Sequence, residues 1–306
     1  MTHNISGRWR LGLALSLLTV LLWGILPLAL TVALETLDPF TVTWFRFFLS
    51  FILLTIYLAI RGQLPRLKQL SSRSWLLLAI ASIFLAANYI LFLQGLQLTS
   101  AANAEVIIQL APLLMGLGGL LVFKERYTIL QWFGVSILCA GLVLFFHEKL
   151  SNLVTDPKTY IFGSSLVILG AFVWAIYALA QKQLLQILSS SQIMVITYGL
   201  CTVIFSFMAQ PKLVLKLDNL HWYTLIFCAL NTLIAYGSFA ESLVHWEASR
   251  VGAVIATAPI VTLISVDFVS VIAPTIIAPE QLTVLGSVGA IMIVGGSIMV
   301  TLGKRR

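Results

Sequence analysis

The stretch from Leu85 to Thr128 constrains the fold of this chain most, because two long apolar segments meet in it at a short polar hinge, Thr99-Ser100. Each segment is long enough to cross a bilayer as one helix, which takes about 20 residues. The second segment carries a carboxyl, an amide, a proline and a glycine at helical spacing, namely Glu105, Gln109, Pro112 and Gly116. Hydrocarbon solvates such a stripe poorly, so we expect it to face protein or a wet cavity.

The composition places the whole chain in the same class as this stretch. Of its 306 residues, 60% are hydrophobic and 9% are charged, whereas soluble domains carry about 25% charged residues. The mean hydropathy of +1.02 leaves too little polar surface for a soluble protein. We therefore predict an all-α integral membrane protein with ten transmembrane helices, at approximately 11–33, 40–60, 75–97, 101–123, 128–146, 160–180, 192–210, 222–244, 251–273 and 281–302.

The organising stretch returns in the second half of the chain, which indicates an internal repeat. At a spacing of 147 residues and without a gap, Tyr89, Phe92, Gln94, Leu96, Ala101 and Ala111-Pro112 match Tyr236, Phe239, Glu241, Leu243, Ala248 and Ala258-Pro259. At a spacing of 155, Glu125, Thr128, Gly134 and Gly141 match Glu280, Thr283, Gly289 and Gly296. We predict a first repeat at 1–150 (spans 1–5) and a second at 151–306 (spans 6–10). Since each holds an odd number of spans, the two copies should be inverted five-helix repeats, as in secondary transporters.

The positive charges predict the orientation in the membrane. With the N-terminus in the cytoplasm, the cytoplasmic segments hold 13 Lys and Arg residues and the outer segments hold 4, while Arg46 lies inside a span. This bias predicts a multi-pass protein of the cell inner membrane with both termini in the cytoplasm. The same bias accounts for the net charge of +7, so we expect no nucleic-acid partner.

The order and the doubling of these motifs make the chain similar to the drug/metabolite transporter superfamily, and within it to the EamA-type ten-helix transporters. The resemblance runs from Trp23-Gly24 to Gly296 and also includes Pro39, Arg46-Phe47, Ala101-Ala102, Trp174 and Ala248-Ser249. The linker before Glu280 is longer than its counterpart in the first repeat, which leaves the end of span 9 undefined. The resemblance implies a secondary transporter that moves a small metabolite by alternating access, often for export. Members of this superfamily carry amino acids and related compounds, sugars and nucleotide sugars.

The candidate substrate cavity consists of aromatic, amide and proline residues inside the predicted spans. These are Trp23, Asn88, Gln109, Pro112, Trp174, Tyr177, Asn231, Tyr236 and Pro259. Small and polar residues also serve plain helix packing, so both interpretations stay open for each residue taken alone. The two prolines each leave a carbonyl without its usual N–H partner, which can kink a helix or offer a contact to a ligand.

Three charged residues inside spans are candidates for an ion pair or for coupling: Arg46, Glu105 and Asp267. Arg46 and Glu105 lie at matching depths below the outer surface, and pairing would lower the cost of about 2.5–3.5 kcal/mol for a charge at the bilayer centre. Such a pair could be structural, or the two residues could form a substrate or proton site. Asp267 lies inside span 9, as a proton carrier or as a hydrogen-bonded carboxyl near the surface. The sequence leaves coupling to protons open.

No catalytic signature accompanies these residues, so we predict that the protein is not an enzyme and uses no cofactor or metal. The chain has no G-x-S-x-G, H-E-x-x-H or phosphate-binding glycine loop, and its three cysteines lack metal-ligand spacing. The alternatives are a flippase for a lipid-linked intermediate and a membrane enzyme acting on lipid, for which Glu241, His245 and Glu247 form the one candidate cluster. The expected partners are a small-molecule substrate and the lipid bilayer, and the protein is a monomer or a homodimer.

Overall fold

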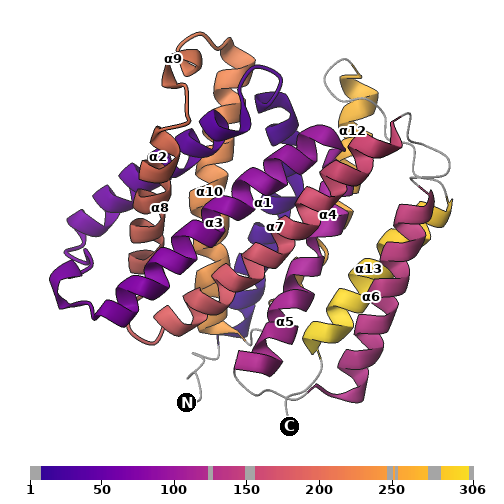
Figure 1. The fold of residues 1–306 in the computed structure, drawn as a ribbon, viewed down its shortest axis with the longest axis horizontal. Coiled ribbons are helices and arrows are strands. Elements are labelled where there is room, and N and C mark those ends of the chain that lie inside the picture. Colours follow the sequence, from indigo (N-terminus) through magenta and orange to yellow (C-terminus); the bar gives the residue numbers. More distant parts are fainter. Residues whose placement is uncertain are drawn as a thin grey trace.

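The computed structural model describes residues 8–122, 127–148, 156–246, 251, 254–274 and 284–302. Within these ranges every regular element is a helix (Figure 1). Their order is α1 (Trp9–Ala33), α2 (Pro39–Ile60), the 3-10 helix η1 (Leu67–Gln69), α3 (Ser72–Leu98), α4 (Ala101–Ile108), α5 (Leu110–Val122), α6 (Ile129–Glu148), α7 (Pro157–Leu184), α8 (Ser190–Ser206), α9 (Pro211–Val214), α10 (Asn219–His245), α12 (Ala258–Ile272) and α13 (Val284–Leu302). The all-α prediction is confirmed.

A helix lies in each of the ten ranges in which the sequence predicts a span. Five of the described helices are long and apolar enough to cross a membrane, namely α1, α2, α3, α7 and the Asn219–Ser242 part of α10, with mean hydropathies between 1.4 and 2.4. Other apolar helices of the described ranges are shorter, among them Ser190–Ser206 and Val284–Val300. The integral membrane class is therefore confirmed, and the count of ten crossings stays a prediction.

Polar side chains at the ends of the apolar segments determine where several helices begin. The carboxylate of Asp38 accepts a hydrogen bond of 3.0 Å from the N–H of Thr41, which satisfies a free donor in the first turn of α2. Pro39 occupies the first position of that helix, where no N–H is needed. The side chains of Asp156 and Asp218 likewise accept hydrogen bonds from backbone N–H groups in the first turns of α7 and α10. Because each residue stands between two apolar segments, it defines both a helix start and a membrane-flanking turn.

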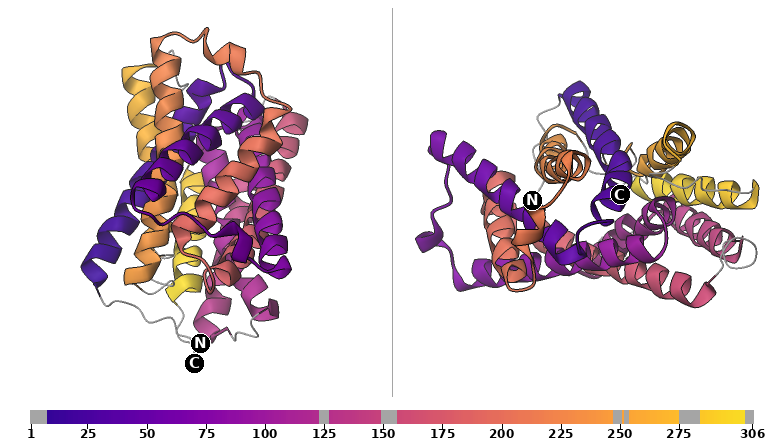
Figure 2. Two further views of the ribbon diagram at one scale, coloured as in Figure 1. Left: turned by 90° about the vertical axis from the view of Figure 1, so that its left-hand side faces the viewer. Right: turned by 90° about the horizontal axis from the view of Figure 1, so that it is seen from above.

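Equivalent helices of the two repeats pack against each other in antiparallel pairs. In the pair α2 and α8, the ring centroid of Phe40 lies 6.4 Å from that of Phe205, and Phe47 lies 5.6 Å from Tyr198, so α8 descends as α2 ascends. The contacts between helices are also related by the repeat (Figures 1 and 2). The packing of α1 against α10 corresponds to that of α7 against α3, and the packing of α1 against α12 corresponds to that of α7 against α5. The structure therefore confirms two inverted repeats.

The helices α6 and α13 form a second antiparallel pair at one side of the molecule, where Figures 1 and 2 show them side by side. A Cβ atom on Gly134 would lie 2.8 Å from the carbonyl oxygen of Gly296, and one on Gly141 would lie 2.7 Å from that of Gly289. Such distances require glycine, because any side chain would push the two backbones apart. The glycines that the sequence repeats at a spacing of 155 are thus explained by this contact.

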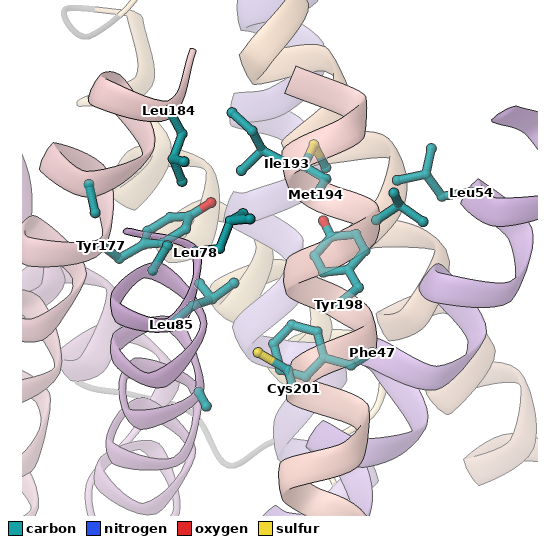
Figure 3. Packing of buried hydrophobic residues seen from close by; sticks show 14 of the residues in the cluster. Phe47, Leu54, Leu78, Leu85, Tyr177, Leu184, Ile193, Met194, Tyr198 and Cys201 are labelled. Carbon is teal, nitrogen blue, oxygen red and sulfur yellow. The ribbon is translucent and has the colours of Figure 1, made fainter. Parts of the chain in front are cut away.

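The largest apolar core lies between α2, α3, α7 and α8 (Figure 3). Phe47 of α2 and Leu85 of α3 are fully buried in it, with Tyr198 and Cys201 of α8. The hydroxyl of Tyr198 donates a hydrogen bond of 3.1 Å to the carbonyl oxygen of Thr232, so its polar atom is satisfied inside the core. This core fixes the position of α2 and α3, which contribute polar residues to the candidate site.

The predicted spans 101–123 and 251–273 are not single helices, and this corrects the expectation of continuous helical stripes. The first is broken at Gln109, between α4 and α5, and a turn at 256–257 precedes α12 in the second. The physical reason is the same in both repeats. Pro112 and Pro259 have no N–H to bond the carbonyl four residues earlier, on Ile108 and Ile255, which are the last helical residues before each break.

Candidate functional site

A cavity of about 130 Å³ lies where the two helix breaks meet α1, α2, α3, α7 and α10. It is lined by Trp23, Leu26, Pro27, Leu30, Arg46, Asn88, Tyr89, Phe92, Leu93, Glu105, Ile108, Gln109, Ala111, Trp174, Tyr236, Ile255 and Ala258. The walls are mostly apolar and aromatic, with four charged or amide side chains. An engineered apolar cavity of about 150 Å³ holds benzene, so this one has room for a small organic group.

Four aromatic residues related by the repeat line the cavity. The ring of Trp23 packs edge-on against Tyr236, with centroids 5.1 Å apart, and Tyr89 lies 6.4 Å from Tyr236. Trp174 contacts the cavity from α7 and packs on Tyr177 at 6.3 Å. Since Tyr89 matches Tyr236 and Trp23 matches Trp174 in the repeat, the aromatic walls are nearly symmetric. Aromatic faces of this kind suit apolar or cationic groups of a ligand.

Arg46 is a buried cation in the cavity wall, with 2% of its surface exposed. Its Nε donates a hydrogen bond of 3.0 Å to the hydroxyl of Thr232, and its guanidinium lies over the ring of Tyr89 at 4.6 Å. These contacts orient the side chain without neutralising its charge. Among the described residues, no carboxylate lies within 4.0 Å of the guanidinium, so its terminal nitrogens are available to an anionic group.

Glu105 faces the same cavity from α4 and is 6% exposed. The ion pair between Arg46 and Glu105 that the sequence suggested is not formed, which corrects that expectation. Thr232 and Tyr89, which lie on two other helices, hold the guanidinium in place of a carboxylate. Within the described ranges the Glu105 carboxyl has no hydrogen bond or ion pair. Both charged groups are therefore available to a ligand bound in the cavity.

The two amides of the cavity differ in how well the protein supports them. Asn88 donates a hydrogen bond of 3.0 Å to the carbonyl oxygen of Gly170, which ties α3 to α7. Gln109 stands at the break between α4 and α5, is 4% exposed, and its Oε1 has no hydrogen-bond partner. A buried amide oxygen without a hydrogen-bond donor is an unfavourable arrangement, so Gln109 is the better candidate for a ligand contact.

The charged and amide residues of the lining all come from the first repeat. In the second repeat, Thr197 matches Arg46 at the spacing of 151 residues that relates Trp23 to Trp174, and Ala235 and Ala256 match Asn88 and Gln109 at the spacing of 147. The hydroxyl of Thr197 donates to the carbonyl oxygen of Ile193 within its own helix, and the two alanines carry no polar group. The cavity therefore has a symmetric aromatic frame and one polar end.

Several residues predicted for the cavity lie outside its lining. Tyr177 is buried in the core between α3 and α8, and Asn231 donates a hydrogen bond of 2.6 Å to the carbonyl oxygen of Leu22, which joins α10 to α1. Pro259 is buried in the first turn of α12. Pro112 lies in α5, but its side chain is outside the described set. Trp23, Asn88, Gln109, Trp174 and Tyr236 do line the cavity.

Asp267, for which the sequence left a proton carrier and a carboxyl near the surface as alternatives, is not among the residues that line the cavity. The buried residues of α12 are Ala258, Pro259, Thr262, Val266 and Ser270. Asp267 follows Val266, about 100° further around the helix, on the exposed side with Ile264 (65% exposed) and Val271 (77% exposed). Pro259 marks a weak point in this span, but the sequence pattern does not show which face of α12 is buried.

Tyr89 and Phe92 also line the cavity, although they are not among the residues predicted for it. Both belong to the series repeated at a spacing of 147, so the repeat itself carried the signal. The apolar lining residues Leu26, Leu30 and Ile255 have no such signal, because they look like any other residue of an apolar span.

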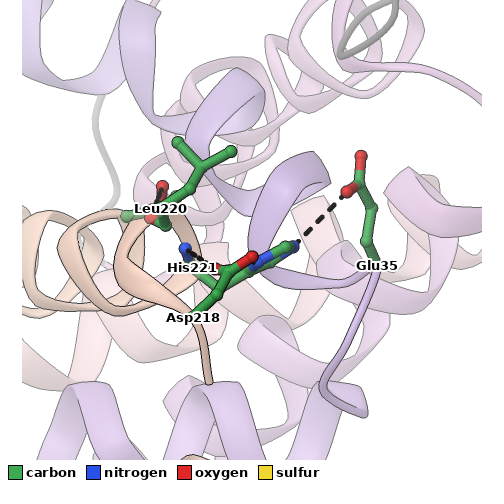
Figure 4. Close-up of polar contacts among 5 residues, drawn as sticks. Glu35, Asp218, Leu220 and His221 are labelled. Carbon is green, nitrogen blue, oxygen red and sulfur yellow. Dashed lines mark hydrogen bonds and ion pairs between the residues drawn. The ribbon is translucent and has the colours of Figure 1, made fainter.

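Two further polar clusters lie away from the cavity. His221 is between two carboxylates, with Nδ1 2.6 Å from Asp218 and Nε2 3.4 Å from Glu35 (Figure 4). Asp218 accepts hydrogen bonds from the backbone N–H and from the ring of His221. These two bonds, the backbone one having the larger effect, hold the pKa of this exposed carboxyl below its usual range. His245 lies 3.2 Å from Glu241, while Glu247 is outside the described residues. In the described part of the chain, no three metal-ligating side chains come together.

Many secondary transporters share an inverted-repeat helical fold with a binding cavity at broken helices. The family model described as the EamA-like transporter family matches residues 10–147 and 161–302. The chain belongs to this family and is a transporter of the drug/metabolite type.

Several known proteins resemble the chain along most of its length. The "Uncharacterized inner membrane transporter YhbE" of Escherichia coli is 37% identical over 96% of this chain and 92% of its own. An "Uncharacterized transporter" of Haemophilus influenzae is 34% identical over 96% of both chains. One chain of a solved crystal structure, 17% identical, superposes with a TM-score of 0.66 over 95% of this chain and 97% of its own, which supports the fold alone. The similarity to the inner membrane transporter YhbE, together with the long apolar helices, supports an integral protein of the inner membrane.

Proposed function

We propose that the protein carries a small amphipathic solute, an amino acid or a related compound, across the inner membrane by alternating access. The observation that carries this proposal is that Arg46 and Glu105 face one cavity without pairing with each other. A solute with a carboxylate and an amine would supply the missing partner for each. Its apolar part would then lie on the aromatic wall formed by Trp23, Trp174 and Tyr236.

The polar asymmetry of the cavity supports one orientation of the solute. Since the charged and amide groups come from the first repeat, the charged end of the solute binds near α2 and α4. The second repeat offers Ile255, Ala258 and Tyr236, which suit an apolar body. The volume of about 130 Å³ favours such solutes over nucleotide sugars.

The paired helix breaks support the alternating-access part of the proposal. Both breaks line the cavity, at Gln109 in one repeat and before Ala258 in the other. A break allows each half-helix to tilt separately, and inverted repeats let the two halves exchange conformations. Proton coupling through Glu105 fits this scheme, because a carboxyl without a fixed cation can exchange a proton and a solute amine at the same place.

The test is a stability panel on the purified full-length protein, since a ligand stabilises the state that it binds. L-Leucine and L-phenylalanine should raise the Tm, while their deaminated acids and decarboxylated amines should do so weakly. Arg46→Gln should lose the response to the acids and Glu105→Gln the response to the amines. Lys212→Gln, on an exposed linker, is the control and should behave as the parent protein. Equal responses of all variants to all compounds would refute the proposal.

A flippase for a lipid-linked intermediate is the second candidate, because of one relative. A "Probable 4-amino-4-deoxy-L-arabinose-phosphoundecaprenol flippase subunit ArnE" of Hamiltonella defensa is 31% identical over 30% of this chain and 90% of its own. The match covers a minor part of the chain. Scrambling of a fluorescent polyprenyl phosphate sugar in proteoliposomes, lost in Arg46→Gln, would favour this function over solute transport.

A further inference from the structure

The linker between α2 and α3, with the first residues of α3, forms an exposed basic surface, residues 61–73. It carries Arg61, Arg66, Lys68 and Arg73, all exposed, and no acidic residue occurs anywhere between Asp38 and Glu105 in the sequence. No carboxylate of the described ranges lies within 4.0 Å of any of these four cations. Four positive charges thus lie in one short segment without an acidic partner in the part of the chain that the structure describes.

Apolar side chains alternate with these cations. Leu64 and Leu67 are each 45% exposed, and the short helix η1 begins at Leu67. At the ends of the linker, Tyr57 is 48% exposed with Arg61 5.1 Å over its ring, and Trp75 is 39% exposed. Tyrosine and tryptophan in such places mark the level of the lipid headgroups. The linker therefore lies where headgroups and acyl chains meet.

The backbone of the linker is fixed to the helix bundle. Gly62 adopts a left-handed conformation (φ 64°), which turns the chain sharply after α2. The carbonyl oxygen of Gln63 accepts a hydrogen bond of 3.2 Å from the side chain of Gln192, at the start of α8. The cations and leucines are thus presented from a defined loop joined to two helices.

We infer that residues 61–73 bind the headgroup of an anionic phospholipid of the adjacent leaflet. The cations meet the headgroup phosphates, and Leu64 and Leu67 enter the boundary of the acyl chains. An orientation signal alone requires the positive charges but gives no role to two exposed leucines beside them. A site for anionic lipid gives a role to both.

The equivalent linker of the second repeat, residues 207–218, is a matched comparison inside the same protein. It has two lysines, Lys212 and Lys216, and one acid, Asp218, for a net charge of 2 − 1 = +1, against +4 for the four cations of residues 61–73. It also exposes three apolar side chains, Phe207 at 84%, Met208 at 56% and Leu215 at 80%. Removing both of its lysines changes the total charge of the protein by as much as removing Arg66 and Lys68.

The experiment measures phosphatidylglycerol bound to the purified full-length protein by native mass spectrometry, with phosphatidylcholine as competitor. The double variant Arg66→Gln/Lys68→Gln should bind phosphatidylglycerol roughly 25-fold more weakly, at roughly 5-fold for each cation near a membrane surface. The control Lys212→Gln/Lys216→Gln should bind within about 2-fold of the parent protein. Equal losses in the two double variants, or no loss in the first, would overturn the inference.

A second arm separates a lipid site from a site for free phosphate. Leu64→Ser/Leu67→Ser keeps every cation and should also lose phosphatidylglycerol, while soluble glycerol phosphate should not compete with the lipid on any variant. Competition by glycerol phosphate at millimolar concentration would show a phosphate site without a lipid role and would overturn the inference. The Tm of each variant without added lipid controls for folding, and a pure folding defect would lower that Tm equally with and without phosphatidylglycerol.

Discussion

Gln109 is the residue at which the helix break and the cavity coincide. Its Oε1 is buried without a hydrogen bond, and its backbone ends α4. Leaving such a group without a partner costs about 1–3 kcal/mol, which a bound solute can recover by hydrogen bonding. The residue is therefore expected to contribute to solute affinity and little to the stability of the empty protein.

Substitution of Gln109 with leucine should weaken solute binding by about 1–2 kcal/mol, or roughly 5- to 30-fold, while the Tm of the empty protein stays the same or rises. The measurement is a titration of the full-length protein with the amino acid that stabilises it best. Asp267→Asn is the comparison, because Asp267 is on the exposed side of α12. It should leave affinity and the pH dependence of transport unchanged. Loss of pH-driven accumulation in Asp267→Asn would return that carboxyl to the mechanism.

At this scale, the sequence could place Arg46 and Glu105 at a similar depth but could not predict that Thr232 and Tyr89 contact the guanidinium of Arg46. Depth along a helix follows from counting residues, whereas contact depends on which helices are neighbours. Thr232 is 186 residues from Arg46 in the chain, and no sequence pattern predicts their hydrogen bond.

At the scale of elements, the start of α10 depends on a carboxylate outside the membrane. Asp218 accepts hydrogen bonds from the N–H and the ring of His221, and its pKa lies below the usual range for that reason. A lowered pKa means that the cap is present above the ordinary titration range of aspartate, about pH 4, and is lost as the pH falls through the lower value.

A spin label at exposed Leu220 should therefore become more mobile in the parent protein as the pH falls below about 4. Asparagine caps helices as well as aspartate and does not titrate, so Asp218→Asn should keep the label equally ordered from pH 6 to pH 3. The same pH-dependent loosening in both proteins would show that another group controls the start of α10.

The packing of α6 on α13 gives a sharp test through two neighbouring glycines. A Cβ on Gly296 would lie 2.6 Å from the carbonyl oxygen of Gly134, whereas one on Gly295 has no heavy atom within 4 Å. Gly296→Ala should lower stability by about 1–3 kcal/mol, as overpacking does. Gly295→Ala should be neutral or stabilise by about 0.4–1 kcal/mol. Chemical denaturation in mild detergent measures both, and equal effects would contradict the close contact.

The elements themselves were largely predictable, and their interruptions were not. Apolar length predicted a helix in every expected range, because hydrophobic segments of that size have few alternatives in a membrane. Pro112 and Pro259 signalled a weak point in spans 4 and 9. Whether the helix bends or stops at such a point depends on tertiary contacts, so the sequence did not show that α12 starts afresh and carries Asp267 outward.

At the scale of the whole molecule, the inverted repeat was predictable because matching residues recur in order and each copy holds five spans. The single polar end of the cavity was not, since it appears only when Thr197, Ala235 and Ala256 are seen opposite their counterparts. The orientation in the membrane rests on 13 cations against 4.

Reporter fusions after Arg73 and Arg306 should therefore report a cytoplasmic position, and one within residues 150–157 should report an external position. A truncated fusion at each site controls for expression. An external C-terminus would require an odd number of crossings, which two inverted copies of five spans do not give.

The most direct test of the central claim is labelling of the cavity from both sides of the membrane. In a cysteine-free background, Gln109→Cys should react with a charged, membrane-impermeant thiol reagent added to either side of oriented vesicles, if the cavity opens alternately to each side as proposed. Asp267→Cys, on the exposed face of α12, should react from neither side within the bilayer. Reaction of Gln109→Cys from neither side, or equal reaction of the two variants, would contradict a central alternating-access cavity at the helix breaks.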